Sequence, residues 1–259
     1  IAVTDFDEYD VSAVSDDDSN GNTLAENASS GAAVGITAAA SDSDGTTNGI
    51  TYSLSSNPDS LFAIDGSTGV VTLSGSLDYE TATSHTIEVT ATSDDTSTST
   101  ASYTIGVTDF DEYDVTTPTD DNGATNEIDE NANAGTVGIT ASASDSDGTT
   151  NAITYSLTSD DGGNFAIDPG TGVVSTTRSL NHEAGATRTI EVTATSADGS
   201  SKSETFTIAV NDVDEFDVSS ISDTNSSAET LAEDASSGAA VGITAAASDS
   251  DGTTNGITY

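Results

Sequence analysis

The sequence predicts an all-β protein built of tandem β-sandwich repeats, and three features of the chain lead to this prediction. Short segments alternate apolar and polar residues, as strands with one buried face do. Turn-forming clusters rich in Asp, Gly, Ser and Thr separate these segments. Long blocks of sequence also recur at a period of about 100 residues.

The alternating segments are rich in Val, Ile, Thr and Tyr, which favour strands. In the first complete repeat we expect strands around residues 33–39, 50–54, 62–64, 70–73, 87–91 and 103–107. Turn clusters at 42–45 and 65–69 separate several of them. The pattern gives about seven strands and no helix, which is typical of an immunoglobulin-like Greek-key sandwich.

The clearest repeated segment is DFDEYDV, which begins at Asp5, returns at Asp109 and appears as DVDEFDV at Asp212. The two spacings are 104 and 103 residues. A period of this length matches an autonomous sandwich domain rather than a solenoid repeat. We therefore expect end-to-end repeats with these bounds: the end of a preceding repeat at 1–8, complete repeats at 9–112 and 113–215, and the first half of a further repeat at 216–259.

The composition excludes several classes of partner. Forty-five acidic against three basic residues give a formal net charge of -42, which opposes binding to nucleic acid or to an anionic membrane surface. The chain has no Cys, so disulfides and Cys-based zinc or redox sites are excluded. No apolar run approaches the ~20 residues that cross a bilayer, and we expect no membrane insertion of this fragment. Both ends read as interrupted strands, so we expect the anchor and secretion signal to lie outside it.

Acidic residues gather where the predicted repeats meet. Each boundary carries Asp-x-Asp-Glu, and further acids are expected at the same ends of the sandwich, in the motifs LDYE and DSDG. Two carboxylates ~4 Å apart repel by ~4 kcal/mol at an effective dielectric near 20, so such a cluster calls for hard divalent cations. An all-oxygen site of flexible geometry suits Ca²⁺ better than Mg²⁺.

The order of these motifs, with core and turn motifs at 42–54, 62–65 and 69–71, resembles cadherin-type repeats in the form found in large bacterial surface and secreted adhesins. The resemblance covers essentially the whole chain and implies calcium as the bound ion. It implies these ligands: Glu26, Asp78, Glu80, Asp109, Asp111, Glu112, Asp145 and Asp147 at the first junction; Glu130, Asn181, Glu183, Asp212, Asp214, Glu215, Asp249 and Asp251 at the second; Asp5, Asp7, Glu8, Asp42 and Asp44 at the upstream one.

The chain departs from the family pattern at three places. Asn181 replaces an Asp in the second L-D-x-E motif, which should weaken that junction. The last linker position is Tyr113 or Phe216 rather than Asn, which leaves only a backbone oxygen. The Asp expected after a late strand is Ser in both repeats, with Asp94 or Asp198 nearby. We therefore expect two calcium ions per junction, with a third as the alternative, and do not assign Asp198 as a ligand.

Two other kinds of site are rejected from the sequence. Residues 16–21 with Glu26 begin like an EF-hand loop, but the Glu stands at position 11 rather than 12, so we expect a flexible acidic turn. Only two histidines occur, His85 and His182, and we expect both to be exposed strand or loop residues. No nucleophile elbow or phosphate loop occurs, and glycoside hydrolysis would need aromatic platforms that a chain without Trp lacks. We expect no enzymatic activity.

The function predicted from the sequence is mechanical. Calcium would stiffen an extracellular, secreted or surface-bound array into a rod that serves as the stalk of a cell-surface adhesin. Calcium ions and the neighbouring repeats are the expected partners, and a polysaccharide or another cell surface is a candidate one. The alternative is a calcium-dependent carbohydrate-binding or homophilic module. A third reading, a disordered acidic segment, is disfavoured because the apolar residues are patterned rather than scattered.

Overall fold

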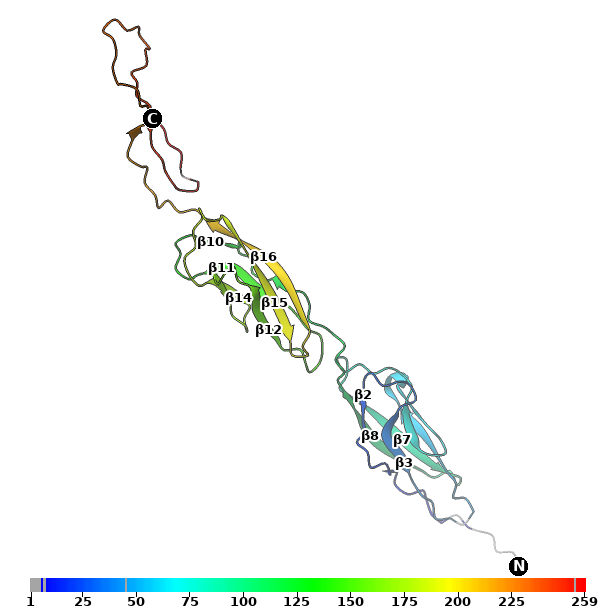
Figure 1. Cartoon of the computed structure of the whole chain (residues 1–259). Helices are drawn as coiled ribbons and strands as arrows, with labels where there is room; N and C mark the ends of the chain where they lie inside the picture. Colours follow the sequence, from blue (N-terminus) through cyan, green and yellow to red (C-terminus); the bar gives the residue numbers. More distant parts are fainter. Residues whose placement is uncertain (1–5, 7, 45, 254) are drawn as a thin grey trace, which may run out of the picture. The chain divides into compact units, whose positions relative to one another are not determined.

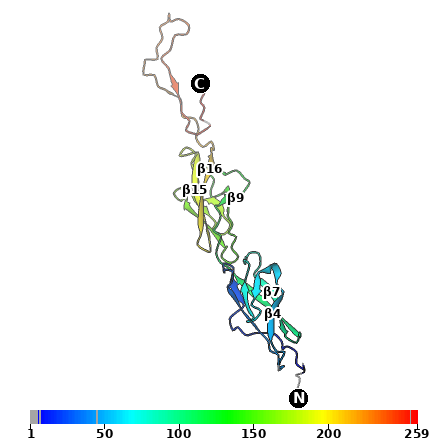
Figure 2. The ribbon, with the colours of Figure 1, turned by 90° about the vertical axis from the view of Figure 1, so that its right-hand side faces the viewer.

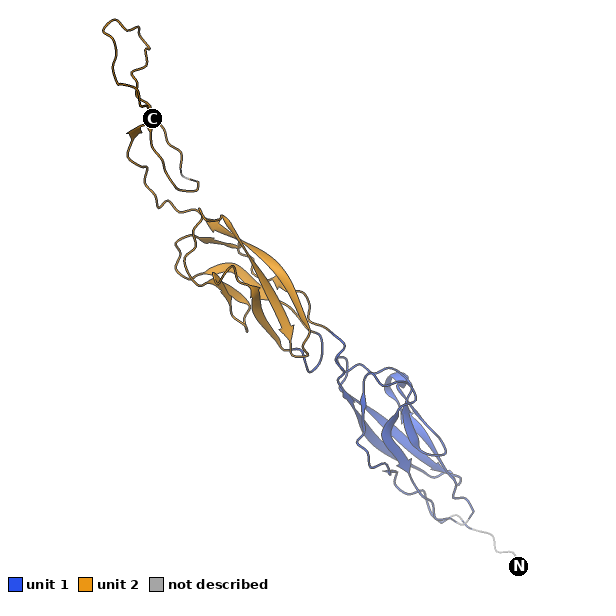
Figure 3. Cartoon of the chain, in the orientation of Figure 1, with its two compact units in different colours: residues 1–113, 146–151 blue, residues 114–145, 152–259 orange. Residues whose placement is uncertain are grey.

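A computed structural model describes residues 6, 8–44, 46–253 and 255–259. The chain divides into two compact units, residues 1–113 with 146–151 and residues 114–145 with 152–259 (Figure 3). Each unit contains one sandwich of two four-stranded sheets (Figure 1). Within the described residues, no helix has the length and apolar character needed to cross a membrane. The predicted all-β fold is confirmed.

The sandwich of the first unit has the sheet orders β1-β3-β6-β5 and β2-β8-β7-β4. Apart from a split first strand, these orders match the two sheets of an immunoglobulin-type sandwich. A 3₁₀ turn at Pro58–Ser60 interrupts the otherwise β chain. The strands are β1 (Ser15–Asp16), β2 (Thr23–Ala25), β3 (Ala33–Ala39), β4 (Ile50–Ser56), β5 (Phe62–Ile64), β6 (Val70–Leu73), β7 (Ser84–Ser93) and β8 (Thr98–Thr108).

The sandwich of the second unit repeats the same topology, with sheet orders β9-β11-β14-β13 and β10-β16-β15-β12. The long hairpin strands β15 and β16 lie side by side in both views (Figures 1 and 2). The strands are β9 (Thr119–Asp120), β10 (Glu127–Asp129), β11 (Thr136–Ser142), β12 (Ile153–Ser159), β13 (Phe165–Ile167), β14 (Val173–Thr176), β15 (Thr187–Ser196) and β16 (Ser201–Asn211). A further pair, β17 (Ser222–Asp223) and β18 (Ala245–Ala246), follows in the last part of the chain.

The six strand positions predicted for the first repeat all carry strands, but the beginning of the repeat was not predicted. Its first strand is split between the sheets: β1 pairs with β3 antiparallel, whereas β2 pairs with β8 parallel. The residues of β1 (SD) and β2 (TLA) include no β-branched or aromatic residue except Thr23, unlike the equally short β5 (FAI), so they give no strand signal. The split matters for the site because it delivers the residue after β2 to the end of the sheet that contains β8.

Each core is built from the alternating positions that the sequence indicated. On β7, Ile87, Val89 and Ala91 are completely buried, and the residues between them are not. β3 in the first unit and β11 in the second are equivalent strands, and the same place on them is occupied by Ile36 and Ile139, each 1% exposed. Burial of a side chain of this size contributes about 1.5–3 kcal/mol. These two cores make the sandwiches rigid supports for the loops at their ends.

The turn before β14 requires a glycine at its last position, residue 172. Asp168 begins the turn, and its Oδ1 accepts the N–H groups of Gly170 and Thr171, which lowers the pKa of Asp168. Gly172 closes it with φ at +71°, a left-handed conformation, and a Cβ there would lie 2.2 Å from the carbonyl oxygen of Ala141. Only a residue without a side chain fits this position.

We expect Gly172→Ala to lower the free energy of unfolding by more than about 1–2 kcal/mol, because the ordinary left-handed penalty adds to a clash with backbone. Urea unfolding in calcium-containing buffer measures this as a lower midpoint at unchanged slope. Gly170→Ala is the matched control, since its Cβ would meet only the Asp168 carboxylate at 3.6 Å. Equal destabilisation by both changes would contradict the assigned turn.

Candidate metal centres

The buried charged residues of the described chain are five acids, and all five belong to the ligands implied by the sequence. Their exposed fractions are 8% for Glu26, 3% for Asp44, 1% for Glu130, 1% for Asp147 and 2% for Asp251. Removing an unpaired carboxylate from water costs several kcal/mol, so buried acids must have hydrogen-bond donors or cations beside them. The partners of these acids therefore define the sites.

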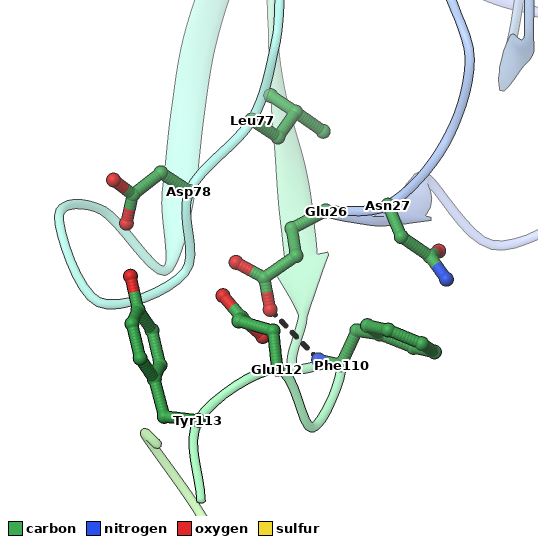
Figure 4. Close-up of a pocket in the computed structure, with 7 residues that line it drawn as sticks. All are labelled: Glu26, Asn27, Leu77, Asp78, Phe110, Glu112 and Tyr113. Atoms are coloured by element: carbon green, nitrogen blue, oxygen red, sulfur yellow. Dashed lines mark hydrogen bonds between the residues drawn. The ribbon is translucent and has the colours of Figure 1, made fainter. Parts of the chain in front are cut away.

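Glu26 follows β2 directly and connects two other segments of the first unit. Its Oε2 accepts the N–H of Tyr79, in the LDYE turn, at 2.5 Å. Its Oε1 accepts the N–H of Phe110, in the linker, at 2.7 Å, and Figure 4 shows this second bond. A carboxylate that accepts two backbone donors is held in one orientation. The glutamate thus brings the turn and the linker together at the end of the sandwich.

Four carboxylates meet around this point, and each offers one oxygen within 4.8 Å of the others: Glu26, Glu80, Asp109 and Glu112. Asp109 Oδ2 accepts the hydroxyl of Thr149, while its Oδ1 is buried and has no hydrogen bond. Partial desolvation, followed by repulsion from the neighbouring acids, raises the pKa of Glu112 to about 7. A divalent cation would satisfy the Asp109 oxygen and relieve the repulsion, and a set of oxygens alone fits Ca²⁺.

A pocket of about 360 Å³ opens beside this group (Figure 4). Its lining combines acids with the aromatic rings of two linker residues: Glu26, Asn27, Leu77, Asp78, Phe110, Glu112 and Tyr113. The volume admits an ion with its remaining water ligands, which calcium sites of six to eight oxygens usually retain in part. The pocket is therefore an access route to the carboxylates.

Asp147 fixes the linker of the first unit. Its Oδ1 accepts the N–H groups of Glu112 at 3.1 Å and Tyr113 at 3.2 Å. One carboxylate oxygen of Asp147 and one of Asp111 lie within 4.8 Å of each other. The same contact recurs at the other two linkers: Asp44 accepts the N–H groups of Glu8 and Tyr9, and Asp251 those of Glu215 and Phe216. The second Asp of each DSDG motif is thus a linker anchor as well as a candidate ligand.

The second unit contains a corresponding centre around Glu130. Its Oε2 accepts the N–H of His182 at 2.6 Å, and its Oε1 accepts the N–H of Val213 at 2.9 Å. Two overlapping groups each offer atoms within 4.8 Å of one another: Glu130, His182, Glu183 and Asp212, and Asp212, Glu215 and Asp251. Desolvation and the neighbouring carboxylates, Glu130 first, raise the pKa of Glu215. The two centres share one plan, but only the second includes an imidazole.

The L-D-x-E aspartate makes a local contact that the sequence did not predict. Both oxygens of Asp78 accept hydrogen bonds from Thr81, at 2.9 and 3.0 Å, so the side chain caps the following turn. Asn181 does the same in the second unit, where its Oδ1 accepts the N–H of Ala184 at 2.6 Å. The Asn replacement therefore preserves the cap. Weaker calcium binding at the second junction stays a prediction.

At the upstream end of the first unit, Asp42, Asp44 and Asp95 offer oxygens within 4.8 Å of one another. The hydroxyl of Ser93 donates to Asp42 and is the main cause of its lowered pKa. The sequence pointed to Asp94 near this position, but its neighbour Asp95 is the residue that joins the group. The missed signal was register: Asp95, and not Asp94, stands two residues after Ser93, as Asp198 stands after Ser196.

The remaining predicted ligands are distributed as follows. Asp5, Asp7 and position 45 of the first DSDG turn lie outside the described residues. Asp145 lies in the second compact unit, half-buried, directly before the segment 146–151 of the first. Asp249 accepts the N–H of Asp251 at 3.3 Å, and a hydrogen bond to Asp251 raises the pKa of Asp214.

Two further expectations concern the acidic loop at 16–21 and the two histidines. We expected a flexible acidic turn at 16–21, but Asp16 lies on β1, where its Oδ1 accepts the N–H of Thr37 at 3.0 Å, while Glu26 accepts the N–H of Phe110 in the linker. The expectation that both histidines are exposed is wrong. His85 is half-buried with its ring 6.0 Å from that of Phe62, and the His182 side chain is only 14% exposed. A single histidine in a turn motif carries no sequence signal for burial.

In the presence of a chelator, the Glu112 carboxyl should titrate with a midpoint near 7, since partial desolvation and four neighbouring acids raise its pKa. A group with a raised pKa holds a proton that calcium must displace, so calcium affinity should fall as the pH drops from about 7 towards 4.5. Carbon-13 NMR of the side chain measures the midpoint, with the exposed Glu204 as the internal control. A Glu112 midpoint near 4.5 would contradict the clustering.

Comparison with known proteins identifies the repeats. The model of the cadherin domain matches residues 22–108 and 125–211. Human protocadherin Fat 4 is 39% identical over 166 residues, which cover 62% of this chain and 3% of that protein. Mouse protocadherin Fat 2 is 36% identical over 131 residues, 49% of this chain and 3% of that protein. The chain thus spans only a small fraction of the length of these relatives.

Solved structures show the same fold. Three repeats of mouse cadherin-23, EC22–24, superpose with a TM-score of 0.67 at 25% identity, covering 89% of this chain and 74% of that one. The extracellular domain of protocadherin GammaB4 gives a TM-score of 0.73 at 20% identity, over 96% of this chain and 42% of that one. With two domain matches that together cover more than half of its residues, the chain belongs to the cadherin family.

Proposed function

We propose that these cadherin repeats form a calcium-stiffened extracellular segment that serves as the stalk of a cell-surface adhesin. The single observation that carries the proposal is the gathering of acids from three separate stretches of chain at the end of each complete sandwich. The glutamate after the second strand, the L-D-x-E turn and the linker each contribute. Cadherin domains are adhesion modules rather than enzymes, and we infer no catalytic role for this chain.

The mechanism follows from what each residue does before an ion binds. Glu26 and Glu130 hold the turn and linker through backbone N–H groups, so the carboxylates stand close together in advance. Calcium supplies the positive charge that offsets their repulsion, with Glu26, Glu80, Asp109 and Glu112 as the ligands in the first unit. A linker that repels itself then becomes a fixed connection.

The expected affinity makes this effect conditional on the environment. Extracellular calcium modules have dissociation constants of about 0.1–1 mM. At tenfold excess of free calcium, one such site adds ~1.4 kcal/mol to the stability of the bound state. Several sites per linker make the gain decisive outside a cell, while a cytoplasm with little free calcium would leave the linkers unbound.

The near identity of the repeats supports a stalk rather than a specific recognition surface. The linker DFDEYDV is repeated without change 104 residues later, and its third copy, DVDEFDV, differs in only two of the seven residues. Copying a domain extends a stalk, whereas a binding face has no need of faithful repetition. The proposal includes a large bacterial surface protein as the full-length protein to which this chain belongs. The relatives named above come from human and mouse.

The competing proposal is that the repeats themselves bind a polysaccharide or a matching repeat on another cell. It predicts calcium-dependent retention of this chain on immobilised polysaccharide, or calcium-dependent self-association. A stalk predicts neither of these.

Removal of one carboxylate charge should open one linker and leave the other intact. We expect Glu130→Gln to weaken calcium binding in the second unit by at least about tenfold, since it alters a buried group that also positions other ligands. Calorimetry counts the lost site. A protease specific for Glu should then cleave after Glu215 even in calcium, while the bond after Glu112 stays protected.

The control is Glu204→Gln, which removes the same charge from an exposed position on β16. It should bind calcium and resist cleavage as the unchanged chain does. Equal cleavage with and without calcium in the unchanged chain would contradict the proposed function.

A further inference from the structure

The second centre differs from the first by one chemically distinct ligand atom. His182 Nδ1 lies 3.5 Å from an oxygen of Glu183 and 3.8 Å from Oδ1 of Asp212. Together with Glu130 these residues offer four ligand atoms, all within 4.8 Å of one another. In the first unit the matching group has four carboxylates, because Tyr79 stands where the second unit has His182.

Two of these four atoms are buried without a hydrogen bond. The Asp212 side chain is 6% exposed; its Oδ2 accepts the N–H and hydroxyl of Thr253, whereas its Oδ1 has no hydrogen-bond partner. His182 Nδ1 also has none. An unsatisfied buried polar atom costs about 1–3 kcal/mol, and here two of them lie next to each other. A ligand between them would satisfy both.

The imidazole is held in this place by its backbone and by the loop beside it. The His182 N–H donates to Glu130, which fixes the turn. A Cβ on Gly252 would lie 2.3 Å from Nδ1, so the ring fits only because this position is glycine. Tyr79 packs in the same way on Gly148, where a Cβ would lie 2.4 Å from the ring. The two positions are therefore structurally equivalent, which makes them a matched pair for exchange.

The chemistry of this donor set does not suit calcium alone. Ca²⁺ takes oxygen ligands, whereas an imidazole nitrogen suits zinc and related transition metals. A tetrahedral zinc site with bonds of about 2.0 Å places its ligand atoms about 3.3 Å apart. The separations from His182 Nδ1 to the oxygens of Glu183 and Asp212, 3.5 and 3.8 Å, are close to this value, and the other ligand atoms lie within 4.8 Å of one another.

We propose that Glu130, His182, Glu183 and Asp212 form a binding site for a divalent transition-metal ion, with Zn²⁺ as the expected occupant. The proposal rests on the proposed function, because Glu130 and Asp212 also belong to the calcium centre of this linker. Zinc there replaces one calcium ion and keeps the turn and the linker connected. The second linker then responds to zinc, and the first does not.

The test is a calorimetric titration of the whole chain with ZnCl₂ and, in parallel, with CaCl₂. We expect one tight zinc site in the unchanged chain, and a tetrahedral Co²⁺ absorption band when cobalt is used as the spectroscopic probe. His182→Tyr, which copies the first unit, should weaken zinc binding by at least about tenfold. Loss of a residue that only orients a metal ligand already lowers metal affinity by about tenfold or more, and His182 would be a ligand itself. His182→Gln is a second variant that removes the imidazole with less bulk.

Two further variants complete the design. His85→Arg, which copies the residue at the matching position of the second repeat, should leave zinc binding unchanged. Tyr79→His should add a second zinc site in the first unit. Nitrogen-15 NMR of the imidazole should show the zinc-dependent shift at Nδ1 of His182.

The outcomes separate this inference from the proposed function. Calcium binding without a tight zinc site, or zinc binding that survives both His182 variants, overturns the zinc site and leaves the calcium proposal standing. Absence of calcium binding at both linkers overturns the proposed function; a zinc site lost in both His182 variants would still support the inference in that case.

Discussion

Mutual repulsion among carboxylates at the ends of the sandwiches is the constraint on which the rest of the structure depends. The chain carries 45 acids and only three basic residues, so protein cations are too few to neutralise these groups. The described ion pairs of Arg and Lys, Arg188 with Asp161 and Lys202 with Asp114, involve acids outside the predicted ligands. Backbone donors therefore take the place of side-chain cations beside the buried acids, and the proposed function adds ions from the solvent.

The backbone supplies the first part of that stabilisation. Glu26 and Glu130 each accept two N–H groups from separate segments, and the last Asp of each DSDG motif accepts two from a linker. These bonds position the oxygens but leave the negative charge in place. The buried Oδ1 atoms of Asp109 and Asp212 lack hydrogen bonds, and in the proposed function they are the atoms that a cation would contact.

The sequence predicted the strands whose residues favour strands and missed those whose residues do not. β7 shows its buried face by alternation over ten residues, and the three-residue β5 is the apolar run FAI, whereas β1 and β2 have the residues SD and TLA. The motifs predicted which acids gather, but not how each side chain is used. Asp78, which the motif predicts as a ligand, also caps a turn, because Thr81 follows within hydrogen-bonding reach. His182 appeared unremarkable because its burial depends on Gly252, which is 70 residues away in the sequence.

The central claim is that calcium turns flexible, self-repelling linkers into rigid ones, and small-angle X-ray scattering of this chain tests it most directly. Scattering in excess calcium should be that of an extended rod, and chelation should change it to the profile of domains joined by flexible linkers. Identical profiles in both conditions would contradict calcium stiffening and would leave these repeats as passive spacers.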